Sequence, residues 1–201
     1  WDLLRKNGGL SIFPPYAEKN MKVYSGRVQA LESILPFLKN KKEKYVIMTD
    51  ANIAVDFDFG AMLQEHIESG ADVSIAYTEQ EIPEELIRAG VHEDMYYTLC
   101  LKDGRVRRIF MNSEEPGIQN LSMNMEREAL IEKIHGAFVR GYSYFERDIL
   151  APRLEKYNIR GYKYDGYYAR ICGLKSYFDE NMKLLDDENL DALFTGGQIY
   201  T

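Results

Sequence analysis

The sequence of 201 residues has little of what marks several classes of protein. It contains two cysteines, Cys100 and Cys172, whose spacing fits neither a metal motif nor a disulfide framework. No apolar run approaches the roughly 18 residues of a membrane-spanning helix. The formal net charge is -7 and no basic patch stands out, so nucleic-acid binding is not predicted. We expect a cytoplasmic protein, because the few thiols suit a reducing compartment.

The remaining composition is that of an ordinary globular chain, with 45% hydrophobic and 28% charged residues. A helix is predicted over 27–39 and another, strongly amphipathic, over 174–185. Short apolar runs at 45–49 and 71–78 are typical of buried parallel strands separated by a helix. Asp103-Gly104 predicts a hairpin between strands 96–102 and 105–111. The order indicates an α/β fold with a mixed, mostly parallel sheet flanked by helices.

Polar residues directly follow the apolar run at 45–49. Asp50 and Asn52 would lie at the carboxyl end of a strand, where α/β enzymes place ligands. A carboxylate there can hold Mg²⁺, which then bridges phosphate oxygens, so Asp50 is a candidate metal ligand. The alternative is that both residues only shape the turn that follows the strand.

Other polar and aromatic residues favour structural roles. The histidines are scattered, and His66 is expected on a helix surface, so none is predicted to be catalytic. Neither Gly-x-Gly-x-x-Gly nor a Walker loop occurs. Exposed positions are expected for Arg107 and Arg108, and a solvated helix end for 39–44. The tyrosines between 157 and 168 are typical of a half-buried sheet face.

A series of short motifs runs along nearly the whole chain. They are Trp1-Asp2-Leu3 with Gly8-Gly9 and Ile12-Phe13-Pro14-Pro15, Tyr24 to Leu31, Tyr45 to Leu63, Gly70 to Ile75, Ser122-Met123, Gly166-Tyr167-Tyr168, Ser176 to Leu185, and Ile199-Tyr200-Thr201. In order and spacing, these motifs together resemble the ADP-glucose pyrophosphorylase (glucose-1-phosphate adenylyltransferase) family.

The resemblance implies a nucleotide-diphospho-sugar transferase fold, Rossmann-like, and an activity in glycogen biosynthesis. The family joins ATP and glucose 1-phosphate to give ADP-glucose and pyrophosphate, with Mg²⁺ held by two aspartates. Residues 1–193 would form a partial nucleotidyltransferase domain. Residues 194–201 would begin the linker to a left-handed β-helix domain. The family's glycine-rich triphosphate loop would precede residue 1.

The chain departs from the family pattern at the positions that carry charge. The two metal aspartates fall on Asn52 and Arg170. The lysine that grips the sugar phosphate falls on Glu115, beside Glu114. An amide brings no negative charge, a guanidinium repels Mg²⁺, and a carboxylate repels phosphate. The resemblance also assigns substrate-binding positions to Arg27, Gln29, Glu114 and Ser122.

These departures predict a catalytically deficient, GlgD-type regulatory subunit that associates with a catalytic subunit of the same family. A different hypothesis is an active metal-dependent nucleotide-sugar enzyme, a nucleotidyltransferase or glycosyltransferase, that uses Asp50 and Asn52. A third is a scaffold for oligomers without regulatory effect. The resemblance further implies that the strand at 45–49 has lost a neighbouring strand. We therefore expect this edge to pair with another chain or with the first residues of its own chain.

Overall fold

The computed structural model describes residues 9–14, 24, 26–80, 96–112 and 118–194. Its helices are α1 (Arg27–Ser33), α2 (Leu35–Lys39), α3 (Phe59–Ser69), α5 (Arg127–Val139), α6 (Leu174–Lys183) and α7 (Asp187–Phe194), with a π-helical segment η1 (Phe145–Leu150) and a 3-10 turn η2 (Ala151–Arg153). Its strands are β1 (Tyr45–Thr49), β2 (Ile53–Val55), β3 (Val73–Thr78), β4 (Tyr97–Lys102), β5 (Arg105–Met111), β6 (Ile118–Glu126), β7 (Ile159–Lys163) and β8 (Tyr168–Arg170).

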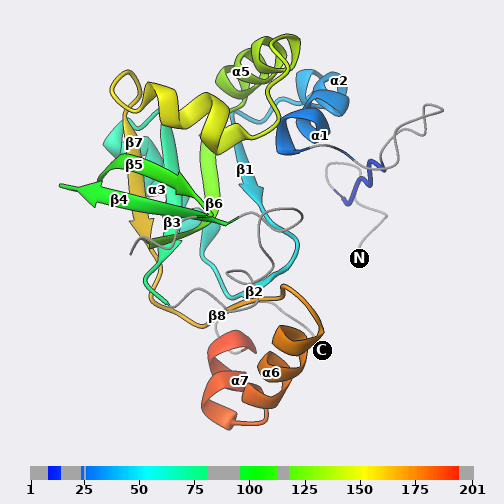
Figure 1. The fold of residues 1–201 in the computed structure, drawn as a ribbon, viewed down its shortest axis with the longest axis vertical. Coiled ribbons are helices and arrows are strands. Elements are labelled where there is room, and N and C mark those ends of the chain that lie inside the picture. Colours follow the sequence, from blue (N-terminus) through cyan, green and yellow to red (C-terminus); the bar gives the residue numbers. More distant parts are fainter. Residues whose placement is uncertain (1–8, 15–23, 25, 81–95, 113–117, 195–201) are drawn as a thin grey trace.

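A six-stranded sheet in the order β1-β6-β3-β7-β5-β4 forms the centre of the molecule (Figure 1). The mixed α/β class is confirmed, but the expectation of a mostly parallel sheet is wrong. Among the described strands only β3 and β7 pair in parallel. The physical reason is that β6 inserts between β1 and β3 and pairs antiparallel with both. β1 and β3 therefore share a direction, as a strand-helix-strand unit requires, without being neighbours.

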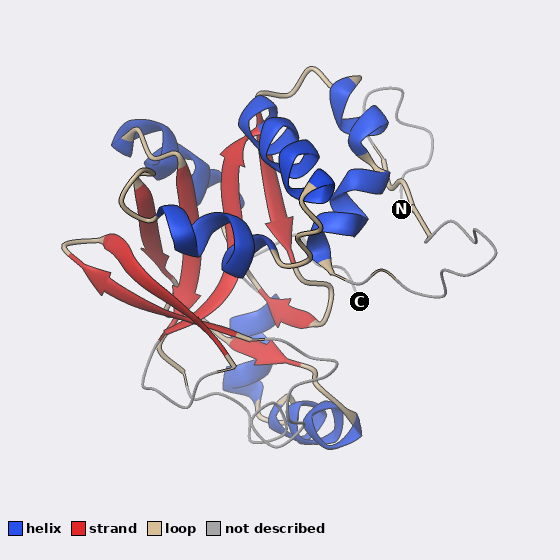
Figure 2. Cartoon of the chain, turned by 45° about the horizontal axis from the view of Figure 1, so that its top comes forward, coloured by secondary structure: helices blue, strands red, loops and turns tan. Residues whose placement is uncertain are grey.

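Helices cover the two faces of this sheet unequally (Figure 2). One face packs against α1, α2, α5 and η1 and holds the main apolar core, which includes Met48, Ile75, Met125, Ile134 and Phe145. A smaller cluster on the other face joins Met62 of α3 to Ala76 and Tyr168. Beyond the sheet, β2 and β8 form a separate two-stranded ribbon that leads into α6 and α7 (Figure 1). No helix in the described ranges has both the length and the apolar character needed to cross a membrane.

Local sequence signals set the ends of several elements. Asp58 begins α3, because its Oδ1 accepts a hydrogen bond from the Ala61 amide at 2.9 Å. Gly70 ends the same helix with a φ of 58°, in the left-handed region that glycine tolerates best. In the β4–β5 hairpin, Asp103 and Gly104 have φ values of 54° and 72°. Both positive values fit the predicted type I′ turn.

Prolines divide two segments for which the sequence predicts single helices. The helix expected over 27–39 is interrupted at Ile34, because Pro36 stands in the first turn of α2 and has no amide hydrogen to continue α1. The segment 144–157, where the sequence also predicts one helix, forms η1 and then η2, with Pro152 in the second. Residues 9–14 contain no strand, although the apolar residues at 10–13 suggest one.

Candidate functional site

Asp50 lies at the carboxyl end of β1 between two guanidinium groups. Arg27 Nη2 donates to Asp50 Oδ1 at 2.5 Å, and Arg170 Nη2 donates to Oδ2 at 3.1 Å. The Arg170 side chain is 7% exposed and the Asp50 side chain 30% exposed. Arg170 is thus turned inward, and both oxygens of the single carboxylate at this point are engaged by cations.

Arg27 also connects this carboxylate to a second acid. Its Nη1 donates to Oε1 of Glu146, a buried side chain on η1. Arg27 is the first residue of α1, and the close approach of α1 to the segment before η1 positions it. The Val28 amide donates to the Ser143 carbonyl at 3.1 Å. A Cβ at Gly26 would lie 2.3 Å from the same oxygen, so glycine is required there.

Burial and charge shift the pKa values of the cluster in opposing ways. Burial raises the pKa of Glu146, although the positive charge of Arg27 opposes that shift. Desolvation tends to lower the pKa of Arg27, but the negative charges of Glu146 and Asp50 outweigh it and raise this pKa. The pKa of Tyr97, at the start of β4, is also raised, first by burial and then by the charge of Glu146. When both acids are ionised, the negative charges of the two carboxylates equal the positive charges of the two guanidinium groups.

The ribbon of β2 and β8 holds the remaining predicted positions together. Ile53 pairs with Arg170 across the ribbon. The Asn52 side-chain amide donates to the Ile171 carbonyl at 3.1 Å, and the Ile171 amide donates to the Asn52 carbonyl at 2.8 Å. Asn52 therefore fastens the end of the ribbon, and Arg170 extends from the ribbon onto Asp50.

The structure brings four of the sequence-predicted residues into one cluster, from α1, the end of β1, and the β2–β8 ribbon. These are Arg27, Asp50, Asn52 and Arg170. Gln29 lies two residues after Arg27 on α1 and is partly buried. The backbone of Ser122 pairs with Thr49, one residue before Asp50. Glu114 and Glu115 lie outside the described residues. The roles assigned to all these positions remain predictions.

Sequence reasoning missed Glu146 and misplaced His66. Glu146 precedes Ile149 and Leu150 by three and four residues, so a charged side chain falls on an apolar helical face, which is a usable signal. His66 is 2% exposed rather than on the surface. Its Nδ1 lies 2.8 Å from Ser74 Oγ, because α3 packs its inner face on β3. Arg107 and Arg108 are exposed, as expected.

The described residues around Asp50 do not fit a divalent cation. Mg²⁺ needs oxygen ligands that carry or share negative charge, and here the nearest carboxylate is saturated by two guanidinium groups. Across the described ranges, no group of three or more histidine, cysteine, aspartate or glutamate side chains could hold a metal ion. The cluster can hold its own elements together and can present a guanidinium edge.

The mixed sheet flanked by helices agrees with the α/β fold of a nucleotide-sugar transferase domain. The chain is 30% identical, over 194 residues, to the glucose-1-phosphate adenylyltransferases of Bacillus mycoides (strain KBAB4), Bacillus cereus (strain Q1) and Bacillus anthracis. The match covers 94% of this chain and 50% of each relative, so the chain spans about half of their length. Over nearly its whole length the chain is thus similar to curated proteins named glucose-1-phosphate adenylyltransferase. No family model matches it.

Proposed function

We propose that the protein is a subunit of glucose-1-phosphate adenylyltransferase in glycogen synthesis, and that it is the catalytically deficient, regulatory subunit. The observation that carries this proposal is the engagement of both Asp50 oxygens by Arg27 and Arg170. At the point where the resemblance expects a metal held by two aspartates, the chain presents one neutralised aspartate, an amide and a guanidinium.

The size of the charge–charge interaction energies indicates how strongly the substitution at Arg170 affects metal binding. Two unit charges 4 Å apart interact by about 4 kcal/mol at an effective dielectric constant of about 20. Replacing an aspartate by Arg170 turns an attraction of that order into a repulsion, and the double charge of Mg²⁺ doubles each value. A site built this way disfavours the metal that would neutralise a triphosphate in the transition state.

The positions expected to contact substrate support the same conclusion. Arg27 is committed to Asp50 and Glu146, so it is not available to grip a nucleotide without breaking two ion pairs. Glu114 and Glu115 would place negative charge where the family holds a sugar phosphate. Gln29 and Ser122 are the remaining predicted contacts, and neither brings the positive charge that a lysine would offer to a phosphate.

A regulatory subunit acts through a partner. We therefore propose a cytoplasmic hetero-oligomer with a catalytic member of the same family, in which this protein changes the response of the active sites. The family's substrates, ATP and glucose 1-phosphate, would be turned over by the partner. Mg²⁺ would be needed there rather than at Asp50.

The test compares synthesis of ADP-glucose by the protein alone, by a catalytic family member alone, and by the co-purified mixture. We expect negligible turnover by the protein alone, and altered kinetics of the mixture. Turnover near that of the catalytic member by this protein alone would overturn the proposal. The active-enzyme alternative, with Asp50 and Asn52 as metal ligands, predicts that turnover and its loss in Asp50→Ala.

The charge argument can be tested separately. Arg170→Asp places a second carboxylate beside Asp50, and we expect measurable Mn²⁺ or Mg²⁺ binding by calorimetry that the parent protein lacks. Arg107→Asp makes the same change on the exposed part of β5 and is the matched control. Thermal unfolding of both variants checks that the buried substitution leaves the fold intact. Equal metal binding by parent and Arg170→Asp would contradict the argument.

A further inference from the structure

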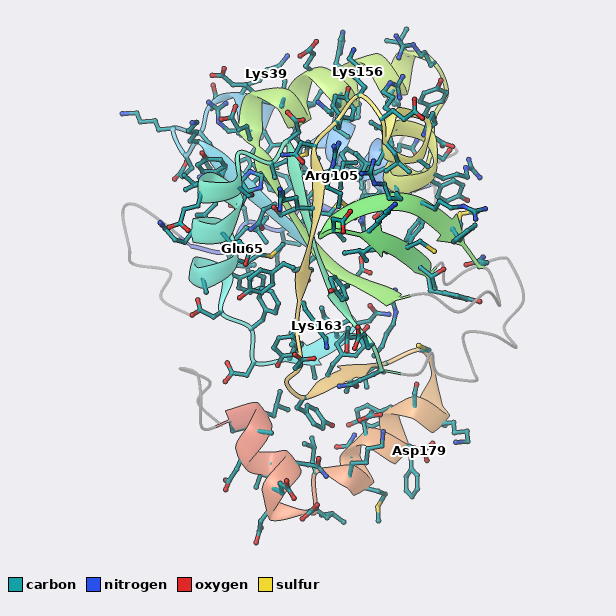
Figure 3. All side chains as sticks on the ribbon, turned by 90° about the vertical axis from the view of Figure 1, so that its left-hand side faces the viewer. Lys39, Glu65, Arg105, Lys156, Lys163 and Asp179 are labelled. Carbon is teal, nitrogen blue, oxygen red and sulfur yellow. The ribbon has the colours of Figure 1, made fainter. Side chains whose placement is uncertain are left out.

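A cavity of about 650 Å³ lies between α5 and the segment that contains η1 and η2, on the side of the sheet with the main core. Its walls come from the last turns of α5, from Tyr142 and Ile149, and from residues 153–157. Lys156, labelled in Figure 3, marks this end of the molecule. The cavity does not include Asp50, Arg27 or Arg170, so it is distinct from the cluster at the end of β1.

Positive charge predominates around this cavity, although the chain as a whole carries a net charge of -7. Its lining includes Lys133, Arg140, Arg153 and Lys156, together with His135, and a single acid, Glu132. Within the described residues, none of the four lysines and arginines forms an ion pair. Like charges gathered without counterions repel one another, and low-dielectric walls strengthen their combined field.

Tyr157 organises these cations. Lys133 Nζ lies 4.4 Å from the centroid of its ring and Lys156 Nζ lies 6.0 Å from it, so two ammonium groups approach the same aromatic ring. Arg105 Nη2 donates to the Tyr157 carbonyl at 3.2 Å, which brings a further cation to the same residue. Arg153 Nη1 donates to the Ile149 carbonyl at 3.0 Å, which fixes its side chain at the wall. These cations are therefore held in place and not free on long side chains.

Helix electrostatics explains only part of this arrangement. Arg140, at the C-terminal end of α5, suits the negative end of that helix, whereas Lys133 and His135 lie before its last turn. Arg153 and Lys156 come from a different segment, so their presence is not explained by charge placement within the sequence of α5. Their convergence on the same cavity calls for a ligand of opposite charge.

We propose that this cavity binds a small anion that carries a phosphoryl group. The volume suits a small molecule, and the lining offers two arginine forks and two ammonium groups as donors to phosphate oxygens. The site lies on helices and short turns remote from Asp50. Its occupant would stabilise the contact between α5 and the η1–η2 segment. The proposal does not depend on the catalytic status of the protein.

Isothermal titration calorimetry of the 201-residue chain with inorganic phosphate, and separately with pyrophosphate, tests the site. We expect saturable binding of one anion per chain that weakens as salt is raised. Lys133→Gln and Lys156→Gln should each weaken it by about tenfold. Lys41→Gln is the matched control, because Lys41 also stacks on an aromatic ring, that of Phe37 at 4.4 Å, but lies outside the cavity.

Each result of the titration either supports or overturns the proposed anion site. Tighter binding of pyrophosphate than of phosphate assigns the cavity to a phosphorylated small molecule, and equal binding assigns it to free phosphate. Either result supports the site, provided that the two cavity variants are impaired and Lys41→Gln is not. Absence of saturable binding up to about 10 mM overturns the proposal. An equal loss in Lys41→Gln also overturns it, because the effect would then be one of overall charge. Lys156 is exposed, so its variant stays informative if Lys133→Gln fails to fold.

Discussion

Arg27 is the residue on which the cluster at the end of β1 depends. It joins Asp50, which follows a strand, to Glu146 on η1, and so ties α1 to both. Removing one member of such a partly buried group leaves the others without their charge partner, which generally destabilises more than the intact group stabilises. Neutral replacements of similar shape are therefore more informative here than truncations.

Glu146→Gln tests the protonation balance of this cluster. Burial raises the pKa of Glu146 in the folded state above its ordinary value of 4.5, so the unfolded chain loses this proton first as the pH rises. From about pH 4.5 upward, until the folded pKa is passed, the parent protein should lose stability relative to Glu146→Gln. Urea unfolding between pH 4 and 8 measures the difference, with exposed Glu155→Gln as the control. If the parent protein instead becomes more stable relative to Glu146→Gln as the pH rises, the raised pKa of Glu146 is refuted.

His66 gives the opposite dependence on pH. Its burial lowers its pKa below the ordinary value of 6.5, so the unfolded chain takes up a proton first as the pH falls. The parent protein should therefore lose stability below about pH 6.5, and His66→Gln, which can still hydrogen-bond Ser74, should lose less. The exposed His135→Gln provides the control. Identical acid profiles for the parent and His66→Gln would contradict the prediction.

At the scale of elements, the ends of strands and helices were predictable because single residues determine them. Asp58 and Gly70 bound α3, and Asp103-Gly104 makes the hairpin, each through local geometry that the sequence already specifies. Strand neighbours were not predictable in the same way. β6 follows β1 by about seventy residues along the chain, and its position between β1 and β3 depends on packing over the whole sheet.

The same limit applied to the cluster. The sequence pointed to Asp50 because it follows an apolar strand, and to Arg170 because its charge departs from the pattern of the family that the chain resembles. It did not indicate that the two side chains meet, or that Glu146 joins them through Arg27. Those contacts span 120, 119 and 23 positions along the chain, and only the folded backbone brings them within reach.

Two glycine-to-alanine substitutions, one at the end of α3 and one within α5, should change the free energy of unfolding in opposite directions. Gly70→Ala places a side chain at a φ of 58° with no atom within 4 Å of the new Cβ, so it should destabilise by about 1 kcal/mol through backbone strain alone. Gly136→Ala makes the same change within α5, also into open space, and should stabilise by about 0.5–1 kcal/mol. Chemical denaturation measures both. Equal effects of the two variants would show that packing, and not backbone conformation, decides.

At the scale of the whole molecule, β1 is an edge of the sheet. It pairs with β6 on one side, and no other described strand borders it (Figure 1). Ile47 in its centre is 37% exposed. The expectation that this edge associates with another chain therefore remains a prediction, supported by an apolar edge strand without a charged side chain at its centre.

Sedimentation at a series of concentrations tests this expectation. The chain should show a mass that rises with concentration, and Ile47→Lys should shift the midpoint to about tenfold higher concentration by placing a charge on the edge. Ile67→Lys is the control, since Ile67 is 47% exposed but lies on α3. A mass that stays that of one chain throughout would contradict the prediction.

The β2–β8 ribbon has a mechanical consequence for the rest of the molecule. α6 and α7 follow it and lie away from the six-stranded sheet, and α6 exposes Leu174, Phe178 and Met182 (Figure 1). Arg170 is the last residue of β8, only four positions before α6 begins. Because so few residues separate them, a change in the tilt of α6 would move the Arg170 guanidinium. The hydrogen bond between Arg170 and the Asp50 carboxylate would then lengthen or shorten.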